Sequence, residues 1–180
     1  MKAAILVNGV PASGKSTVAR AIAAGAAWPL LTLDTIKEAF FNHLGTGDRL
    51  YNRTLGKASY EAIFALIADF PEGMTAVIDA WFGFQPVETL DQHIARAGIA
   101  KTVEVWCHAA PEIIGARYMA RVGQRPGGHL GAEYVPELIE LAKRAKPTGR
   151  FPVINVDTSN PPAAGELIAQ IRAELARSSY

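Results

Sequence analysis

The chain has 180 residues, of which 49% are hydrophobic, and its 18 Lys and Arg nearly balance its 17 Asp and Glu. This length suits one domain spanning 1–180, and the apolar share excludes a disordered chain. The net charge of +1 argues against nucleic acid as a partner, and the single cysteine excludes an internal disulfide and fits a cytoplasmic location. No apolar run is long enough for a signal peptide or a membrane span.

Strand-length apolar runs alternate with helical segments. A first strand at 3–7 leads into a glycine-rich turn and a helix that includes 18–24. In chain order, the next expected elements are a strand at 30–33, helices at 38–44 and 60–69, a strand at 75–79, a helix at 87–97, a strand at 101–107, a helix from Pro111 to a break at Pro126, a helix at 136–146, a strand at 151–157 and a helix at 165–177.

This alternation predicts an α/β fold in which helices cover both faces of a parallel sheet, giving three layers. Right-handed crossovers bring the carboxyl ends of all strands to one edge, where such folds bind their ligands. Three features fall at that edge: the glycine-rich turn after the first strand, Asp34 after the second and Asp79 after the third. Their convergence predicts a functional site.

The glycine-rich turn matches the P-loop pattern G-x-x-x-x-G-K-[ST] between a strand and a helix. The glycines let successive backbone N–H groups point at phosphate oxygens, and the positive end of the helix dipole adds to their attraction. Lys15 can reach the outer phosphates, and the Ser16 hydroxyl can hold Mg²⁺. The candidate nucleotide-binding residues are Gly9, Val10, Pro11, Ala12, Ser13, Gly14, Lys15, Ser16 and Thr17.

Two carboxylates are expected beside the phosphates. Asp34 could accept the proton of an attacking hydroxyl, although Asp also caps helices well; beside a P-loop we favour the catalytic role. Lys37 lies one helical turn later and would face the same cleft. Asp79 ends an apolar strand, as in a Walker B motif, and is a candidate Mg²⁺ ligand with Ser16, although many strands end in Asp for turn reasons. Asp157 is expected to have a structural role or to lie near the base.

Arg117, Arg121 and Arg125 recur every four residues and would form one stripe on the expected helix. Such a stripe is usually a solvated face, but no acidic residue lies between Ile113 and Arg125 to pair with it. Because the guanidinium fork suits phosphate, we expect a lid whose Arg117 and Arg121 stabilise the transferring group. Arg125 borders the Pro-Gly-Gly break and is a weaker candidate, and His129 and Arg150 are further additions.

Most aromatic residues lie between 40 and 84, a region that could line an acceptor pocket. Ordinary core packing explains Phe64 and Phe70, whereas Trp81 and Phe82 directly follow Asp79 at the ligand edge and are the better pocket candidates. Cys107 ends a strand in an apolar setting and is expected to be buried and inert.

Taken together, these motifs resemble the small P-loop kinases related to nucleoside monophosphate kinases, in the group with chloramphenicol phosphotransferase, zeta toxins and polynucleotide kinase. The resemblance implies the sheet order 2-3-1-4-5, a helical lid, Asp34 as the base and contact between adenine and the segment after the fifth strand. Several relatives carry Arg where Lys37 stands. The resemblance runs through Gly9 to Thr17, Asp34 with Lys37, Val77 to Ala80 with Phe82, Arg117 and Arg121, and Val156 to Thr158.

The favoured function is a Mg²⁺- and ATP-dependent transfer of the γ-phosphoryl group to a hydroxyl of a small metabolite or antibiotic. The acceptor region would span about 35–72 and the lid about 117–135. One alternative is a polynucleotide 5′-hydroxyl kinase, which needs a positive track that a near-neutral chain does not favour. The other is a nucleotide-dependent switch without an acceptor, which has no need of a base such as Asp34.

Overall fold

The computed structural model describes residues 1–177 and is built on a five-stranded parallel sheet in the order β2-β3-β1-β4-β5. β1 is central because its residues are the most apolar, and Ala4, Ile5, Leu6 and Val7 are fully buried. The parallel class and the strand order confirm the sequence expectation. The strands are β1 (Lys2–Asn8), β2 (Leu30–Thr32), β3 (Thr75–Asp79), β4 (Ile99–His108) and β5 (Val153–Asp157).

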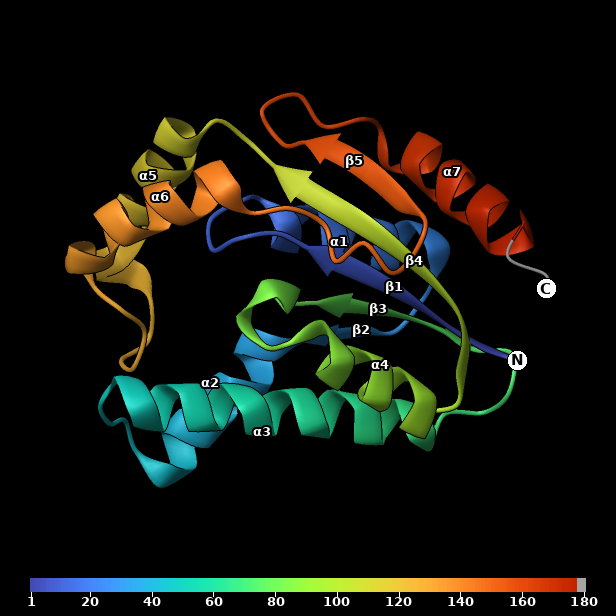
Figure 1. Cartoon of the computed structure of the whole chain (residues 1–180), viewed down its shortest axis with the longest axis horizontal. Helices are drawn as coiled ribbons and strands as arrows, with labels where there is room; N and C mark the ends of the chain where they lie inside the picture. The colour runs from blue at the N-terminus through green and yellow to red at the C-terminus, as the bar shows by residue number, and fades with distance from the viewer. Residues whose placement is uncertain (178–180) are drawn as a thin grey trace.

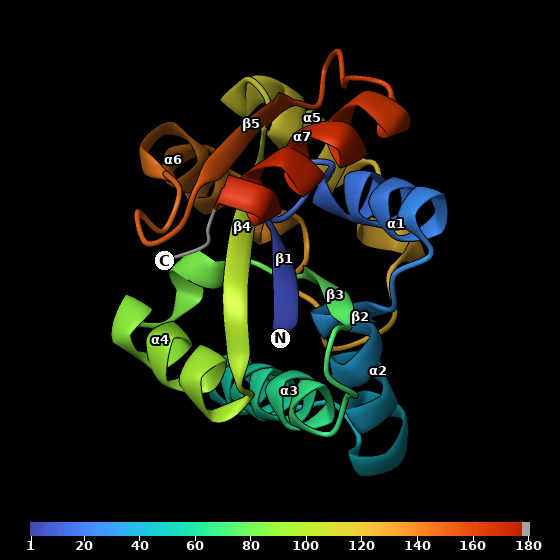
Figure 2. The same cartoon turned by 90° about the vertical axis from the view of Figure 1, so that its right-hand side faces the viewer.

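Helices cover both faces of this sheet (Figures 1 and 2). One face packs on apolar side chains of α1 and α7, and the opposite face packs on α3 and α4. The three-layer arrangement is therefore confirmed. The α-helices in the described residues are α1 (Lys15–Ala26), α2 (Leu33–Leu44), α3 (Arg49–Ala68), α4 (Val87–Arg96), α5 (Pro111–Met119), α6 (Val135–Arg144) and α7 (Ala164–Arg177).

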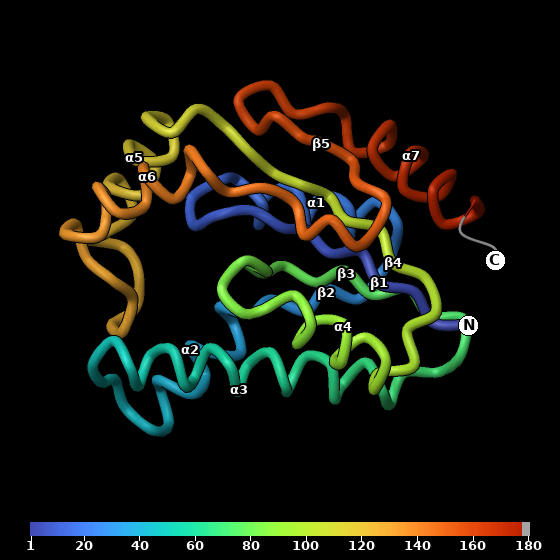
Figure 3. The backbone as a smooth tube through the Cα atoms, in the orientation of Figure 1, coloured from blue at the N-terminus to red at the C-terminus, as the bar shows by residue number. Residues whose placement is uncertain are grey.

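A smaller helical unit lies beyond the carboxyl ends of the strands. Helices α5 and α6 pack on each other through a separate apolar cluster that includes Ile114, Tyr118 and Leu138. The segment 120–134 connects them and descends toward the α2 and α3 pair, as the tube in Figure 3 shows. Short 3-10 turns interrupt this segment at Val122–Gln124 and Ala132–Tyr134. The unit therefore faces the helices that follow β2 across the edge of the sheet.

Three helix boundaries differ from the sequence expectation. α2 begins at Leu33, so Asp34 lies in its first turn rather than at the end of a strand. α3 begins at Arg49 instead of Tyr60, because the Asp48 carboxylate accepts a hydrogen bond of 2.8 Å from the Tyr51 N–H and caps the helix. α5 ends at Met119 rather than near Pro126, and its chain continues into a 3-10 turn.

A charged residue, Glu104, is fully buried in the middle of β4. Within residues 1–177, no helix has both the length and the hydrophobicity needed to cross a membrane.

Candidate active site

The P-loop follows β1 and has a backbone that only glycine fits at two points. Gly9 has a φ of +155°, and a Cβ there would lie 2.4 Å from the Cys107 carbonyl oxygen. Gly14 has a φ of +86°, and a Cβ there would lie 2.8 Å from the Thr158 side chain. Helix α1 starts immediately afterwards at Lys15. The first N–H groups of α1 are therefore available for an anion, as the P-loop motif predicts.

A buried hydrogen-bond network ties the start of the P-loop to two other loops. The Asn8 Oδ1 atom accepts from the N–H groups of Gly9 at 2.8 Å and Phe82 at 3.0 Å. The Asn8 Nδ2 atom donates to Glu104 at 2.7 Å. Glu104 also accepts from the backbone N–H of Thr148 at 3.1 Å and from its hydroxyl at 2.6 Å. Glu104 thus links the P-loop, the turn after β3 and the loop before β5.

Arg117 binds the loop after β5 and does not line the cavity at the carboxyl edge of the sheet. Its guanidinium donates to the Thr158 hydroxyl at 2.8 Å and to the Thr158 carbonyl at 3.1 Å. The same Thr158 hydroxyl donates to the Ser13 carbonyl of the P-loop at 2.7 Å. In this geometry Arg117 supports the back of the P-loop rather than facing Asp34.

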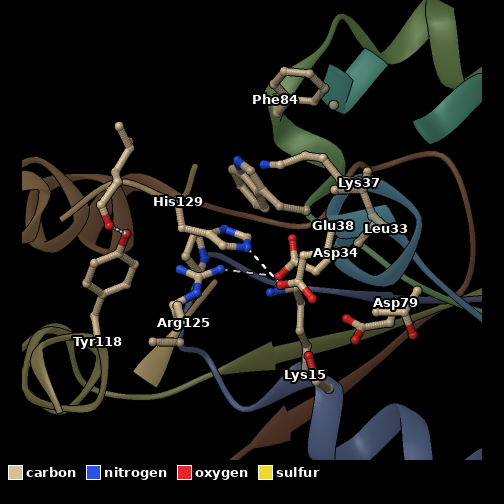
Figure 4. A pocket seen from close by; sticks show the side chains of 18 of the residues that line it. Lys15, Leu33, Asp34, Lys37, Glu38, Asp79, Phe84, Tyr118, Arg125 and His129 are labelled. Atoms are coloured by element: carbon tan, nitrogen blue, oxygen red, sulfur yellow. Dashed lines mark hydrogen bonds and ion pairs between the residues drawn. The ribbon is translucent and has the colours of Figure 1, made fainter. Parts of the chain in front are cut away.

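A cavity of about 680 Å³ opens at the carboxyl edge of the sheet. Residues from α1, α2, α3, the turn after β3 and the segment 120–134 line it, and Figure 4 shows several of them pointing into one space. The structure therefore brings together most of the site residues expected from the sequence. These are Lys15, Ser16, Asp34, Lys37, Asp79 and Arg121.

Asp34 is the carboxylate that faces the middle of this cavity (Figure 4). The residue at the N-cap of α2 is Thr32, so capping does not account for Asp34. Its Oδ2 atom lies 3.3 Å from an Arg125 guanidinium nitrogen, and its side chain is 45% exposed. Burial raises the pKa of Asp34, but the surrounding positive charges lower it by more, so the group is ionised at neutral pH. These charges are Lys15, His129, Arg125 and Lys37.

Asp79 and Ser16 present oxygen atoms of the kind that bind a hard cation. Asp79 is only 3% exposed, and its Oδ1 atom has no hydrogen-bond partner within the described part of the chain. Burial raises the pKa of Asp79, and nearby Lys15 and the Ser16 hydroxyl offset this only in part. An unpartnered buried carboxylate oxygen beside a P-loop serine fits Mg²⁺, which binds through one or two protein oxygens together with phosphates and water.

The segment 120–134 reaches the acceptor side through one ion pair and one hydrogen bond. Arg125 contacts Asp34, and the His129 Nε2 atom lies 2.8 Å from a Glu38 carboxylate oxygen (Figure 4). Because α5 ends at Met119, the expectation of a single arginine stripe on one helix is wrong. Arg121 still lines the cavity, while Arg125, the weaker candidate from the sequence, is the arginine paired with Asp34.

Aromatic side chains form one wall of the cavity. Trp81 and Phe84 line it, and the buried Tyr60 donates its hydroxyl hydrogen bond to the Trp81 carbonyl. Trp81 therefore lies at the cavity, where the sequence placed it, and its contact with an acceptor stays a prediction. Phe82 does not line the cavity: it is 5% exposed and packs edge-on against Tyr60 in the core, which corrects its assignment as a pocket residue. Phe64 belongs to the same core, as expected.

Sequence reasoning missed a stripe of α3 that lines the cavity. The signal was present as a helical spacing of i, i+3, i+4, i+7 and i+11, but it was hidden because the helix was expected to begin at Tyr60. The stripe consists of Arg49, Asn52, Arg53, Gly56 and Tyr60.

The other sequence candidates lie outside the site. Arg150 forms ion pairs with Glu88 and Asp91. Asp157 is exposed, and its Oδ1 atom accepts from the Ser159 N–H at 2.9 Å in a local turn. Cys107 is buried, which raises the pKa of its thiol to about 12, so it is inert as expected.

Comparison with known proteins agrees with this fold. The structure resembles a protein from Chloroflexus aurantiacus described as a putative kinase, with a TM-score of 0.79, 24% identity, and coverage of 97% of this chain and 98% of that one. It also resembles Chaetomium thermophilum Kti12 in complex with ADP-AlF3, with a TM-score of 0.66, 14% identity, and coverage of 96% and 98%. A third is shikimate kinase from Acinetobacter baumannii in complex with shikimate, with a TM-score of 0.59, 15% identity, and coverage of 99% and 94%.

At these identities the structural similarities show a shared fold. No curated protein matches the sequence. A family model described as AAA domain matches residues 5–137, which is well over half of the chain. The protein therefore belongs to the AAA domain family, with a P-loop kinase-like fold.

Proposed function

We propose that the protein is a Mg²⁺- and ATP-dependent phosphotransferase that moves the γ-phosphoryl group of ATP to a hydroxyl of a small molecule. The observation that carries this proposal is the position of Asp34. It is an ionised, half-exposed carboxylate that lines the same cavity as Lys15 of the P-loop and faces open space large enough for a second substrate. Trp81 and Phe84 line the same cavity and would give an acceptor molecule, rather than water alone, a surface to bind beside Asp34.

In the proposed reaction, the acceptor oxygen forms a bond to the γ-phosphorus while the bond from that phosphorus to the β–γ bridging oxygen breaks. ADP leaves, and Asp34 accepts the proton of the acceptor hydroxyl. Lys15, Arg121 and Arg125 line the cavity and would stabilise the charge on the transferring group. Arg125 already pairs with Asp34, which keeps the carboxylate ionised before the acceptor binds.

Asp79 and Ser16 would hold the metal ion. When bound there, Mg²⁺ would neutralise charge on the phosphate oxygens. Within the described residues, no group of three or more His, Cys, Asp or Glu forms a metal site. The protein therefore supplies few ligands, as is usual where the nucleotide's phosphates complete the coordination of Mg²⁺.

The proposal also assigns roles to two regions of a single domain. Residues 35–72 contain most of α2 and α3, whose cavity-facing side chains would contact the acceptor. Residues 117–135 contain Arg121, Arg125 and His129 and would act as a lid over the reacting groups. The near-balanced charge and single cysteine are consistent with a small-molecule acceptor and a cytoplasmic enzyme.

A second candidate function is a nucleotide-dependent switch that hydrolyses ATP without an acceptor. Lys15, Ser16 and Asp79 at the P-loop would serve such a switch equally well, because binding nucleotide and Mg²⁺ requires no acceptor. The switch predicts slow hydrolysis that is unchanged by any small hydroxyl compound.

ADP release from Mg-ATP tests these alternatives across a panel of sugars, sugar acids, nucleosides, aminoglycosides and phenicols. Wild type is compared with Asp34→Asn, and ATP affinity is measured separately for both. We expect one class of acceptor to raise ADP release far above background with wild type only, at unchanged ATP affinity. Low hydrolysis that is equal in both proteins and indifferent to all acceptors would support the switch instead.

A further inference from the structure

The cations that line the acceptor side of the cavity are not all paired. Arg49 forms an ion pair of 2.6 Å with Glu137, and Arg125 and His129 pair with Asp34 and Glu38. These contacts use the carboxylates of the acceptor side. Two more cations line the same wall, and neither forms an ion pair or hydrogen bond with any residue in 1–177. They are Lys37 of α2 and Arg53 of α3.

Lys37 is held close to the proposed base. It lies three residues after Asp34, one turn along α2, a spacing that places the Cβ atoms about 5–6 Å apart on one face. Its side chain is half-buried, and its ammonium lies 5.4 Å from the centre of the Phe41 ring. Burial lowers the pKa of Lys37, and Asp34 offsets this only in part. A half-buried ammonium without a carboxylate partner is a position that an anion would stabilise.

Arg53 stands on the α3 stripe, one turn before Gly56 and two turns before Tyr60. Gly56 leaves the wall open between them, because a Cβ there would have only the Phe84 ring within 4 Å, at 3.6 Å. Arg53, which is exposed to solvent, and the Phe84 ring both line the cavity at this opening. The guanidinium can donate two hydrogen bonds at once to a carboxylate or a phosphate.

We propose that the acceptor carries a carboxylate or phosphate in addition to its hydroxyl, and that Lys37 and Arg53 bind this anionic group. Trp81 and Phe84 would then contact an apolar face of the same molecule. The proposal rests on the proposed function, since it requires the hydroxyl to face Asp34. Because Asp34 and Lys37 are one helical turn apart, the anionic group lies only a few bonds from the hydroxyl. The acceptor is therefore a compact hydroxy acid or hydroxy phosphate.

Two series of probes, each on one skeleton, separate charge from shape. The first is 4-(hydroxymethyl)benzamide, 4-(hydroxymethyl)benzoate and 4-(hydroxymethyl)phenyl phosphate, and the second is glycerol, glycerate and glycerol 3-phosphate. Binding is measured by calorimetry with Mg²⁺ and a non-hydrolysable ATP analogue, and transfer is measured by ADP release with Mg-ATP. A preference within the charged members distinguishes a carboxylate site from a phosphate site.

We expect the charged members to bind at least about tenfold more tightly than the neutral member, and Arg53→Gln and Lys37→Gln each to remove about tenfold of that affinity. Arg53→Lys should restore part of the loss because it retains the charge. The matched control is Lys57→Gln, which removes an exposed charge one turn further along α3, outside the cavity, and should change nothing.

The anion site is overturned if the neutral members bind as tightly as the charged ones, if no charged member binds, or if Arg53→Gln behaves like Lys57→Gln. Transfer to neutral and charged members alike would leave the phosphotransferase standing without the anion site. Charge-dependent binding that Arg53→Gln weakens, with transfer to no member, would leave the anion site standing and count against the phosphotransferase.

Discussion

Replacing Glu104 tests whether one buried carboxylate holds the active-site loops together. In Glu104→Gln the side chain keeps its shape but exchanges one acceptor oxygen for an NH₂ group. The Asn8 amide cannot turn to compensate, because its Oδ1 atom is already used by the N–H groups of Gly9 and Phe82. The remaining Gln oxygen must therefore stay on Asn8, and the NH₂ group must face Thr148, where the carboxylate now accepts from the hydroxyl at 2.6 Å.

The expected loss follows from these contacts. Glu104→Gln removes one hydrogen bond to a charged acceptor, which we expect to cost about 1–2 kcal/mol of unfolding free energy. Glu104→Ala leaves the buried Asn8 amide and the Thr148 N–H without their acceptor and opens a void, so we expect about 3–5 kcal/mol. For a chain of this size each kcal/mol lowers Tm by about 2–4 °C.

Thermal unfolding followed by calorimetry, together with the KM for ATP, measures both consequences. The network predicts that Tm falls in the order wild type, Gln, Ala. It also predicts that the KM for ATP rises in the Ala variant, because Asn8, which accepts from the Gly9 N–H, loses its buried partner. The matched control is Thr102→Val, which changes a buried residue of β4 outside the network and should leave the KM for ATP unchanged. The reasoning is refuted if Glu104→Gln and Glu104→Ala both melt with wild type and bind ATP equally well.

Three further predictions concern the site. Asp79→Asn should raise the Mg²⁺ requirement of turnover by about tenfold or more. The metal-free Tm at pH 7 should be unchanged or higher, because burial raises the pKa of Asp79 and the folded state of the wild type is destabilised once the pH exceeds that pKa. A loss of Tm together with an unchanged Mg²⁺ profile would contradict this. Gly14→Ala should destabilise the fold and raise the KM for ATP through its φ of +86° and its contact with Thr158, whereas Gly73→Ala, which has the same φ of +86° but nothing within 4 Å, should carry only the backbone strain of about 1–2 kcal/mol; equal Tm losses would argue against the contact. Because the pKa of Asp34 is lowered, the Tm difference between wild type and Asp34→Asn should stay constant down to about pH 5 and shrink only below about pH 4, and shrinkage centred above pH 5 would show that the carboxyl is not held ionised.

The sheet and the phosphate-binding loop could be predicted from the sequence because both are encoded locally. Apolar runs such as Ala3 to Val7 have strand length, and the P-loop glycines occupy positions that a side chain cannot share. Strand order followed from the family resemblance, and Asp34 and Asp79 reached one cavity because the carboxyl ends of parallel strands meet at one edge.

Other parts of the site depend on partners that are distant in the sequence. The arginine pattern at 117, 121 and 125 has helical spacing, but α5 stops at Met119, so each arginine has a different neighbour. Arg125 meets Asp34 across 91 positions of the chain, and Glu104 meets Asn8 across 96. Periodicity describes only neighbours within one element, so it could not show these contacts.

The measurement that tests the central claim most directly is the destination of the γ-phosphoryl group. Wild type is incubated with Mg²⁺ and γ-labelled ATP in the presence of the acceptor class that raises ADP release, and the label is separated into phosphorylated acceptor and inorganic phosphate. Our account predicts that the label passes to the acceptor and that Asp34→Asn abolishes this product while still binding ATP. Label recovered only as inorganic phosphate, at the same rate with and without Asp34, would contradict it.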